Sequence, residues 1–391
     1  MKDRIIKSMF VFIFTGLLFF PLIQFSFEII PRKSLNGFTI PPKPSPALDT
    51  LINGKFQTAY ETWFHRKHGL WGYLVRFNNQ LNFEVFRQIS SGYRSSVLVG
   101  KEGFLFENAY LPDYNRILSI DNVIDHVGDR LKLLSELLEK KNKKLIVLYS
   151  ASKIEVHPEY LQDRFLISGR ENRQNNLSRM IDRLEGSGVR VINSYEYFKN
   201  LVRPFELVYF NKSGAHWNER GACLITSHLV EVLSNELKNN LQNFSCTSLV
   251  ERPVPVEYDL DIVKIANLWS ESKYLVPVLA PRTENVAIEN VHRPKIMLVG
   301  TSFVWPMLKY LRKHKVFDNS YFYYYFKRRV SLDNNKELRF GKEFDGWKND
   351  LNNSEAVVIE INQSAVHNTG FQFVDLAINY LSAESPPDLL D

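Results

Sequence analysis

The chain has 391 residues, of which 45% are hydrophobic and 24% charged, a globular composition that excludes a disordered or fibrous protein. Lysine and arginine total 49 against 43 aspartates and glutamates, so the formal net charge is +6. The first 33 residues hold five bases and two acids, which leaves +3 for the rest. So weak a field does not indicate a nucleic-acid-binding protein, although it is compatible with an anionic polymer.

The N-terminal segment, residues 1–33, is predicted to be a signal anchor. Residues 8–27 are 20 consecutive uncharged residues, which as a helix would span roughly 30 Å, the thickness of a hydrocarbon core. Three bases precede this run, as in an export signal, and no small-x-small cleavage site follows it. An uncleaved single span is therefore favoured over a cleaved signal peptide. Three bases on the far side leave the orientation open by charge alone, but the export-signal start favours a body outside the cytoplasm.

Residues 34–94 are predicted to be a spacer followed by a helical lead-in. The stretch 40–46 contains four prolines within seven residues and indicates a stiff, extended connection. Between residues 48 and 90, large apolar residues such as Trp63, Trp71 and Phe77 recur at intervals compatible with helices.

The body, residues 95–391, alternates predicted strands and helices. A hairpin is expected between Val97 and Phe106, with a Lys-Glu-Gly turn. The predicted strands are 145–149, 189–192, 295–299, 322–326 and 356–361, and the predicted helices are 124–138, 174–184, about 219–237 and one from 303. Residues 240–290 are less regular. Short, wholly apolar strands that alternate with helices predict an α/β fold with a mainly parallel sheet covered on both faces.

Two cysteines exclude a disulfide framework and a cysteine-rich metal site. Cys223 lies in an apolar helical stretch and Cys246 in a loop-like stretch, and nothing in their spacing demands pairing. We expect two unpaired thiols rather than one bridge.

Ser302 is the candidate nucleophile. It follows the predicted strand that ends at Gly300 and precedes a helix, which places its hydroxyl at the carboxyl end of a parallel sheet, where α/β proteins bind ligands. Free N–H groups at the helix start would stabilise an oxyanion there. Serine is also a favoured N-cap residue, so the local pattern alone is compatible with a purely structural role.

His216 is the candidate base. It lies in a glycine-containing loop directly before a predicted helix, and an imidazole has the near-neutral pKa that activation of a hydroxyl requires. A lone loop histidine is more often a surface residue. The remaining histidines lack the i,i+4 spacing of zinc ligands, so neither a metal nor a cofactor is predicted. A third polar segment, Tyr149 to Tyr160, follows a core strand and either shapes the site or forms a turn.

Taken together, five ordered motifs in residues 95–365 resemble the SGNH-hydrolase-like domain of the alginate O-acetylation proteins, exported bacterial polysaccharide O-acetyltransferases. The matching segments are Val99-Gly-Lys-Glu-Gly-Phe-Leu-Phe106, Ser152-Lys153 with His157-Pro-Glu-Tyr-Leu161, Gly214-Ala-His-Trp-Asn-Glu-Arg-Gly-Ala222, Leu260-Asp-Ile262 and Gly300-Thr-Ser-Phe303. The resemblance implies a three-layer SGNH-hydrolase-like fold for residues 95–391.

The resemblance also implies nucleophilic acyl transfer. Ser302 would attack an acetyl donor, His216 would take its proton, and the acetyl group would pass to a polysaccharide hydroxyl. The implied donor partner is a membrane-bound O-acyltransferase, and the implied location is a single-pass protein of the bacterial inner membrane with its main domain in the periplasm.

Two positions depart from the family pattern. The family has an acidic residue two positions before the histidine, where this chain has Gly214, and an aspartate before the serine, where it has Thr301. Glu155, Asp259 and Asp261 are candidate substitutes for the missing acid. The predictions left open are an acyltransferase with a Ser–His dyad or a relocated acid, a carbohydrate acetylesterase, and a catalytically degenerate polysaccharide-binding or assembly subunit.

Overall fold

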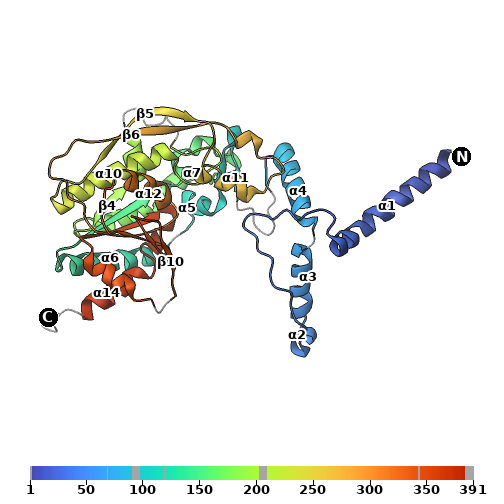
Figure 1. Cartoon of the computed structure of the whole chain (residues 1–391), viewed down its shortest axis with the longest axis horizontal. Coiled ribbons are helices and arrows are strands. Elements are labelled where there is room, and N and C mark those ends of the chain that lie inside the picture. Colours follow the sequence, from blue (N-terminus) through green and yellow to red (C-terminus); the bar gives the residue numbers. More distant parts are fainter. Residues whose placement is uncertain are drawn as a thin grey trace. The chain divides into compact units, whose positions relative to one another are not determined.

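The computed structural model describes residues 2–67, 69–89, 97–118, 120–201, 209–341 and 344–383 (Figure 1). The chain divides into two compact units: unit 1 comprises Met1–Val99 with Ile262–Lys273, and unit 2 comprises Gly100–Asp261 with Tyr274–Asp391. The boundary predicted between residues 94 and 95 lies outside the described residues.

Unit 1 contains the N-terminal helices. They are α1 (Lys2–Phe27), α2 (Leu48–Ile52), α3 (Lys55–Lys67) and α4 (Trp71–Phe86), followed by strand β1 (Val97–Val99). Among the described residues α1 is the one helix long and apolar enough to cross a membrane, with a mean hydropathy of 2.1 in an 18-residue window of Arg4–Phe27. The apolar helix predicted at the N-terminus is therefore present.

Unit 2 is built on a seven-stranded sheet with the order β10-β9-β8-β7-β11-β3-β4. Its strands are β3 (Lys144–Ser150), β4 (Arg190–Asn193), β7 (Ile296–Gly300), β8 (Tyr321–Tyr324), β9 (Arg328–Ser331), β10 (Glu337–Arg339) and β11 (Ala356–Asn362). Strands β8, β7, β11, β3 and β4 run parallel, and β9 and β10 add antiparallel strands at one edge. The predicted mainly parallel α/β sheet is confirmed.

Helices cover both faces of this sheet (Figure 1). The α-helices of unit 2 are α5 (Leu111–Tyr114), α6 (Asp121–Glu139), α7 (Lys153–Val156), α8 (Asn176–Leu184), α9 (Ser194–Lys199), α10 (Glu219–Leu237), α12 (Val304–Lys313), α13 (Gly346–Asn353) and α14 (Phe373–Ala383). Helix α11 (Asp261–Ala266) is divided between the units: Asp261 belongs to unit 2 and the rest of the helix to unit 1. Successive strand residues point to opposite faces, so Leu298 joins the core under α10 and α12, whereas Val299 joins the core under α6, α8, α13 and α14. This is the expected three-layer arrangement.

The segment that looked irregular contains a second, two-stranded antiparallel sheet. Strands β5 (Phe244–Arg252) and β6 (Val278–Asn285) pair with a register shift between Cys246 and Leu249. This sheet packs against α10 and brings Cys246 to Cys223, and the two form a disulfide with a Cα–Cα distance of 6.2 Å. The expectation of unpaired thiols was wrong, because the pairing arises from this tertiary contact rather than from sequence spacing.

The Lys-Glu-Gly turn predicted between Val97 and Phe106 is present in unit 2. The strand β2 (Leu105–Glu107) follows a 3₁₀ turn at Lys101–Gly103, and the N–H of Gly100 donates to the carbonyl of Phe104 at 2.7 Å to close that turn.

Candidate active site

Ser302 lies just beyond the carboxyl end of β7, the central strand of the seven-stranded sheet. Strand β7 finishes at Gly300, α12 begins at Val304, and Ser302 occupies the sharp turn between them. A Cβ on Gly300 would lie 2.8 Å from Val304 Cγ2 and 3.0 Å from Glu360 Oε2, so only glycine lets the turn pack this closely. The turn thus presents the Ser302 hydroxyl at the carboxyl edge of the sheet, as predicted.

His216 is held against this turn by its neighbours. Trp217 is fully buried and its indole N–H donates to the carbonyl of Phe303 at 3.0 Å. Asn218 caps α10 through its side-chain oxygen, which accepts the N–H groups of Arg220 and Gly221. The His216 ring therefore has a fixed position, and its Nε2 lies 2.6 Å from Ser302 Oγ. The structure brings the two predicted site residues together.

A carboxylate completes the arrangement, and it comes from Asp261 at the start of α11. One carboxylate oxygen of Asp261 is hydrogen-bonded to Nδ1 of His216, and the other accepts the N–H of Ala215 at 2.7 Å. The other two candidate acids are engaged elsewhere: Glu155 pairs with Arg170 and Asp259 pairs with Arg252. The sequence left open a Ser–His dyad, an acid supplied from elsewhere and a non-catalytic relative; of the three carboxylates that it named, Asp261 is the one that contacts His216.

Gly214 has no space for the side chain that the family pattern places there. A Cβ at this position would lie 2.4 Å from the carbonyl oxygen of Tyr258 and 3.2 Å from two backbone atoms of Asp259. Backbone atoms cannot move aside as a flexible side chain would. The segment that carries Asp261 therefore occupies the volume that an acid at residue 214 would need.

The third predicted segment supports the site rather than reaching it. Lys153, in the short helix α7, is buried, and its ammonium donates to the carbonyls of Leu105, Asn211, Lys212 and Gly214 at 2.9, 2.5, 2.8 and 3.0 Å. Burial lowers its pKa well below the usual value, with Asp261 and Glu107 opposing that shift. Lys153 thus fixes the backbone just before His216.

Nearby carboxylates favour the protonated, charged form of the His216 imidazole. Burial by itself lowers the pKa of His216, but the hydrogen bond and charge of Asp261, together with two further carboxylates, outweigh burial and raise that pKa. These carboxylates are Glu107 and Glu360, whose own pKa values are raised by burial. The cluster therefore stabilises the imidazolium that forms when His216 accepts a proton.

Two residues of β11 and one that directly follows β8 also reach the site, and sequence reasoning did not name them. Glu360 is fully buried and accepts the backbone N–H and the hydroxyl of Thr301 at 2.7 and 2.8 Å, which fixes the turn beside Ser302. Tyr325 has a positive φ of 48° and donates its N–H to the carbonyl of Gly300 at 2.8 Å. Burial raises the pKa of the Tyr325 phenol, and the hydrogen bond between this phenol and Ser302 partly offsets that rise.

Asn362 is the third of these residues. Asn362 is the last residue of β11, the strand that pairs with β7, and the carboxyl end of β7 leads into the turn that carries Ser302. Its Nδ2 is buried and has no hydrogen-bond partner in the part of the chain that the structure describes. An amide donor of this kind is suited to an oxyanion formed beside Ser302.

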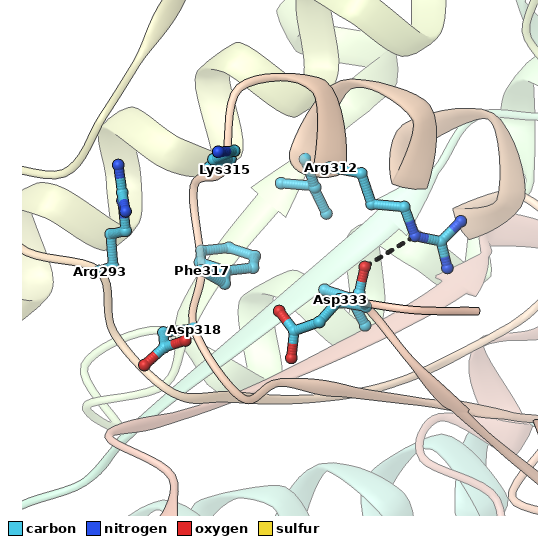
Figure 2. Close-up of a pocket in the computed structure, with 8 residues that line it drawn as sticks. Arg293, Arg312, Lys315, Phe317, Asp318 and Asp333 are labelled. Atoms are coloured by element: carbon cyan, nitrogen blue, oxygen red, sulfur yellow. Dashed lines mark hydrogen bonds between the residues drawn. The ribbon is translucent and has the colours of Figure 1, made fainter. Parts of the chain in front are cut away.

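A cavity of about 270 Å³ lies at the other end of the strands (Figure 2). It is lined by Arg293, Leu311, Arg312, Lys315, Phe317, Asp318, Leu332 and Asp333. Arg293 precedes β7 and Asp318 precedes β8, so the cavity lies at the amino ends of strands whose carboxyl ends carry the site. One strand of five residues separates these ends by roughly 16 Å. In the described ranges, no group of three or more His, Cys, Asp or Glu side chains has a metal-binding arrangement.

Comparison with known proteins identifies similar domains. The family model for the SGNH hydrolase-like domain of the acetyltransferase AlgX matches residues 97–318. The O-acetyltransferase domain of Pseudomonas putida AlgJ is 16% identical, with 73% of this chain and 100% of that one covered and a TM-score of 0.48. Pseudomonas aeruginosa AlgX is 16% identical over 71% of this chain and 67% of that one (TM-score 0.44). Bacillus cereus PatB1 is 13% identical over 71% and 99% (TM-score 0.44). A search among curated proteins found no match.

Proposed function

The chain belongs to the family of the SGNH hydrolase-like acetyltransferase AlgX, and on that premise we propose that it is an O-acetyltransferase acting on a cell-surface or secreted polysaccharide. The observation that carries the proposal is the continuous hydrogen-bonded series Ser302–His216–Asp261. A serine, an imidazole and a carboxylate in this order are the components of nucleophilic acyl transfer. Because Asp261 supplies a carboxylate to His216, the alternative of a catalytically degenerate binding subunit is less well supported.

In the first half of the reaction, Ser302 Oγ attacks the carbonyl carbon of an acetyl donor while His216 Nε2 accepts the hydroxyl proton. Asp261 holds the other ring nitrogen as the N–H tautomer and stabilises the imidazolium. The tetrahedral oxyanion accepts a hydrogen bond from Asn362 Nδ2. The intermediate collapses to acetyl-Ser302, and the leaving group departs with the proton from His216.

In the second half, a sugar hydroxyl replaces the leaving group. Neutral His216 takes the proton of that hydroxyl, whose oxygen attacks the acetyl-serine carbonyl, and Ser302 recovers its proton when the sugar ester is released. The same residues would perform ester hydrolysis if water were the acceptor, so the acceptor distinguishes a transferase from the carbohydrate acetylesterase that the sequence leaves open.

The N-terminal helix supports a location at the outer surface of the inner membrane. We assign α1 as an uncleaved anchor, because its apolar run is long enough to span a bilayer and no small-x-small cleavage site follows it. The Cys223–Cys246 disulfide fits an oxidising compartment. Because acetyl-CoA is confined to the cytoplasm, a membrane-bound O-acyltransferase is the proposed source of the acetyl group.

The decisive experiment is detection of the acyl-enzyme. The full chain in detergent is incubated with a chromogenic acetyl ester, with and without glycan acceptors, and mass spectrometry searches for acetyl-Ser302. We expect the adduct in the wild type, its absence in Ser302→Ala, and its persistence in Ser178→Ala, which changes an exposed serine on α8. Faster release of the chromophore with a glycan, and acetylated glycan as product, indicate a transferase. No adduct with any donor, the acyltransferase included, would contradict the proposal.

A further inference from the structure

Helix α4 has its polar and apolar faces reversed relative to an ordinary surface helix. The face packed inside unit 1 carries Gly72, Arg76, Asn79 and Phe83. The opposite face carries Leu74, Phe77, Leu81 and Val85, which are 61%, 60%, 49% and 60% exposed. Their spacing of three, four and four residues places all four on one side of a helix. We call them the α4 apolar face.

The reversed orientation is fixed by specific hydrogen bonds. The guanidinium of Arg76 donates to the carbonyls of Ser34 and Leu268 at 2.8 and 3.3 Å. The side chain of Asn79 donates to the carbonyl of Ala266 at 2.8 Å. Rotation of α4 to bury its apolar face would leave these buried donors and acceptors unpaired, which is costly. The apolar face is therefore held outward.

The same helix is fastened to the chain directly after α1. The hydroxyl of Tyr73 donates to the carbonyl of Pro31 at 2.9 Å, and Gly72 packs so closely that a Cβ there would lie 1.9 Å from the carbonyl oxygen of Lys33. Pro31 is four residues beyond Phe27, the end of α1, so about 14 Å of extended chain at most separates them. If α1 spans a bilayer, the start of α4 lies within about the depth of its headgroup layer.

The charge and aromatic content of unit 1 suit such a location. Residues 28–99 carry nine lysines and arginines against four acids, most of the net charge of the whole chain. Trp269 is 51% exposed, with Tyr73 at 6.1 Å and the Lys33 ammonium 5.9 Å from its ring. Tryptophan, tyrosine and basic residues are enriched at membrane surfaces, and anionic lipids attract basic segments close to an anchor.

We propose that the α4 apolar face lies in the headgroup region of an anionic bilayer and gives the protein a second membrane contact beside α1. Leu74 to Val85 covers about 16 Å along the helix, enough for a helix lying in the plane of the interface. The inference rests on the membrane-anchor part of the proposed function. It is independent of the acetyl-transfer part.

The test uses the full chain in lipid nanodiscs with one environment-sensitive label. Cys223 and Cys246 are joined in a disulfide, so a fluorophore reacts only with an introduced cysteine. Leu81→Cys reports on the α4 apolar face, Val85→Cys repeats the measurement if the first variant does not fold, and Asp182→Cys on exposed α8 is the aqueous control. Hydrolysis of the chromogenic ester verifies that each variant is folded.

We expect the Leu81 label to show blue-shifted emission, quenching by shallow spin-labelled lipids and protection from iodide, all stronger with phosphatidylglycerol than with phosphatidylcholine alone. A Leu81 label as accessible to iodide as the Asp182 label would overturn the proposal. So would protection that requires a second membrane protein and is absent in lipid alone, because the occupant would then be a protein. The intact mass of the chain tests the anchor separately: a mature chain that begins after Phe27 contradicts the uncleaved span, whatever the label reports.

Discussion

The sharpest test of the proposed mechanism is Asp261→Asn, which changes one atom of the proposed acid. The remaining side-chain oxygen can still accept the Ala215 N–H, but the new amide nitrogen then faces His216 Nδ1 as a donor. Neutral His216 must in response carry its proton on Nε2, where it can no longer accept the proton of Ser302. By analogy with the same change in serine-protease triads, we expect kcat to fall by about 10⁴-fold, equivalent to about 5 kcal/mol of transition-state stabilisation.

The pH dependence provides a second readout of the same substitution. His216 acts as a base only when neutral, so the wild-type rate rises with pH through the raised pKa of His216, above the usual value of about 6.5. In Asp261→Asn, burial remains while the main opposing contribution is lost, so the acidic limb moves to lower pH even though the plateau is much lower.

The assay is kcat/KM for chromogenic acetyl-ester hydrolysis across the pH range, with folding monitored by thermal unfolding. Glu257→Gln, an exposed carboxylate in the same segment, is the matched control and is expected to retain both the wild-type rate and the wild-type limb. An Asp261→Asn enzyme with an unchanged plateau and an unchanged limb would refute the assignment of Asp261 as the acid.

Four further outcomes are expected. Gly214→Asp, and to a smaller degree Gly214→Ala, should lower both Tm and turnover, because the added atoms meet backbone; higher turnover in Gly214→Asp would contradict the role of the present acid. Asn362→Ala should lower kcat by about 10²- to 10³-fold and should lower Tm modestly, because the side-chain oxygen of Asn362 also accepts the N–H of Ser364; an unchanged kcat would remove Asn362 from the oxyanion site. Lys153→Met should cost about 3–5 kcal/mol in urea unfolding, since four backbone carbonyls, two of them in fully buried contacts, lose their donor; a loss below about 1 kcal/mol would argue against the buried cation. Replacing Cys223 and Cys246 by serine should cost about 3 kcal/mol while the rate persists, and equal stability with and without reductant would contradict the disulfide.

The elements nearest the sheet were predictable because their signals are local. The run of apolar residues at 145–149 predicted a buried strand, and β3 extends it by one residue at each end. The helix predicted at about 219–237 coincides with α10, where Asn218 supplies the cap. Strands buried in a parallel sheet have wholly apolar sequences, and helix N-termini favour a capping side chain. Both elements can therefore be recognised from a pattern of a few consecutive residues.

The elements that were missed depend on contacts distant in sequence. Strands β5 and β6 are only partly buried, so their sequences lack an apolar run that would reveal them. The pairing of Cys223 with Cys246 depends on the packing of β5 against α10, a tertiary contact that the sequence does not reveal. Asp261 is 45 residues from His216, and no periodicity or spacing links the two; the sequence could name it among three carboxylates but could not choose it.

Gly214 and Asp261 are best understood as one structural exchange. A side chain at residue 214 is excluded by the backbone at Tyr258 and Asp259, and that same backbone delivers the Asp261 carboxylate to His216. The Ser213 hydroxyl donates to the carbonyl of Asp259 at 2.6 Å, which joins the two segments on the other side of the glycine. Under the proposed mechanism, the glycine is therefore a requirement of the relocated acid rather than a sign of lost catalysis. Neither position can be judged alone: a glycine in place of the family acid indicates inactivity only where no carboxylate enters the space that it leaves.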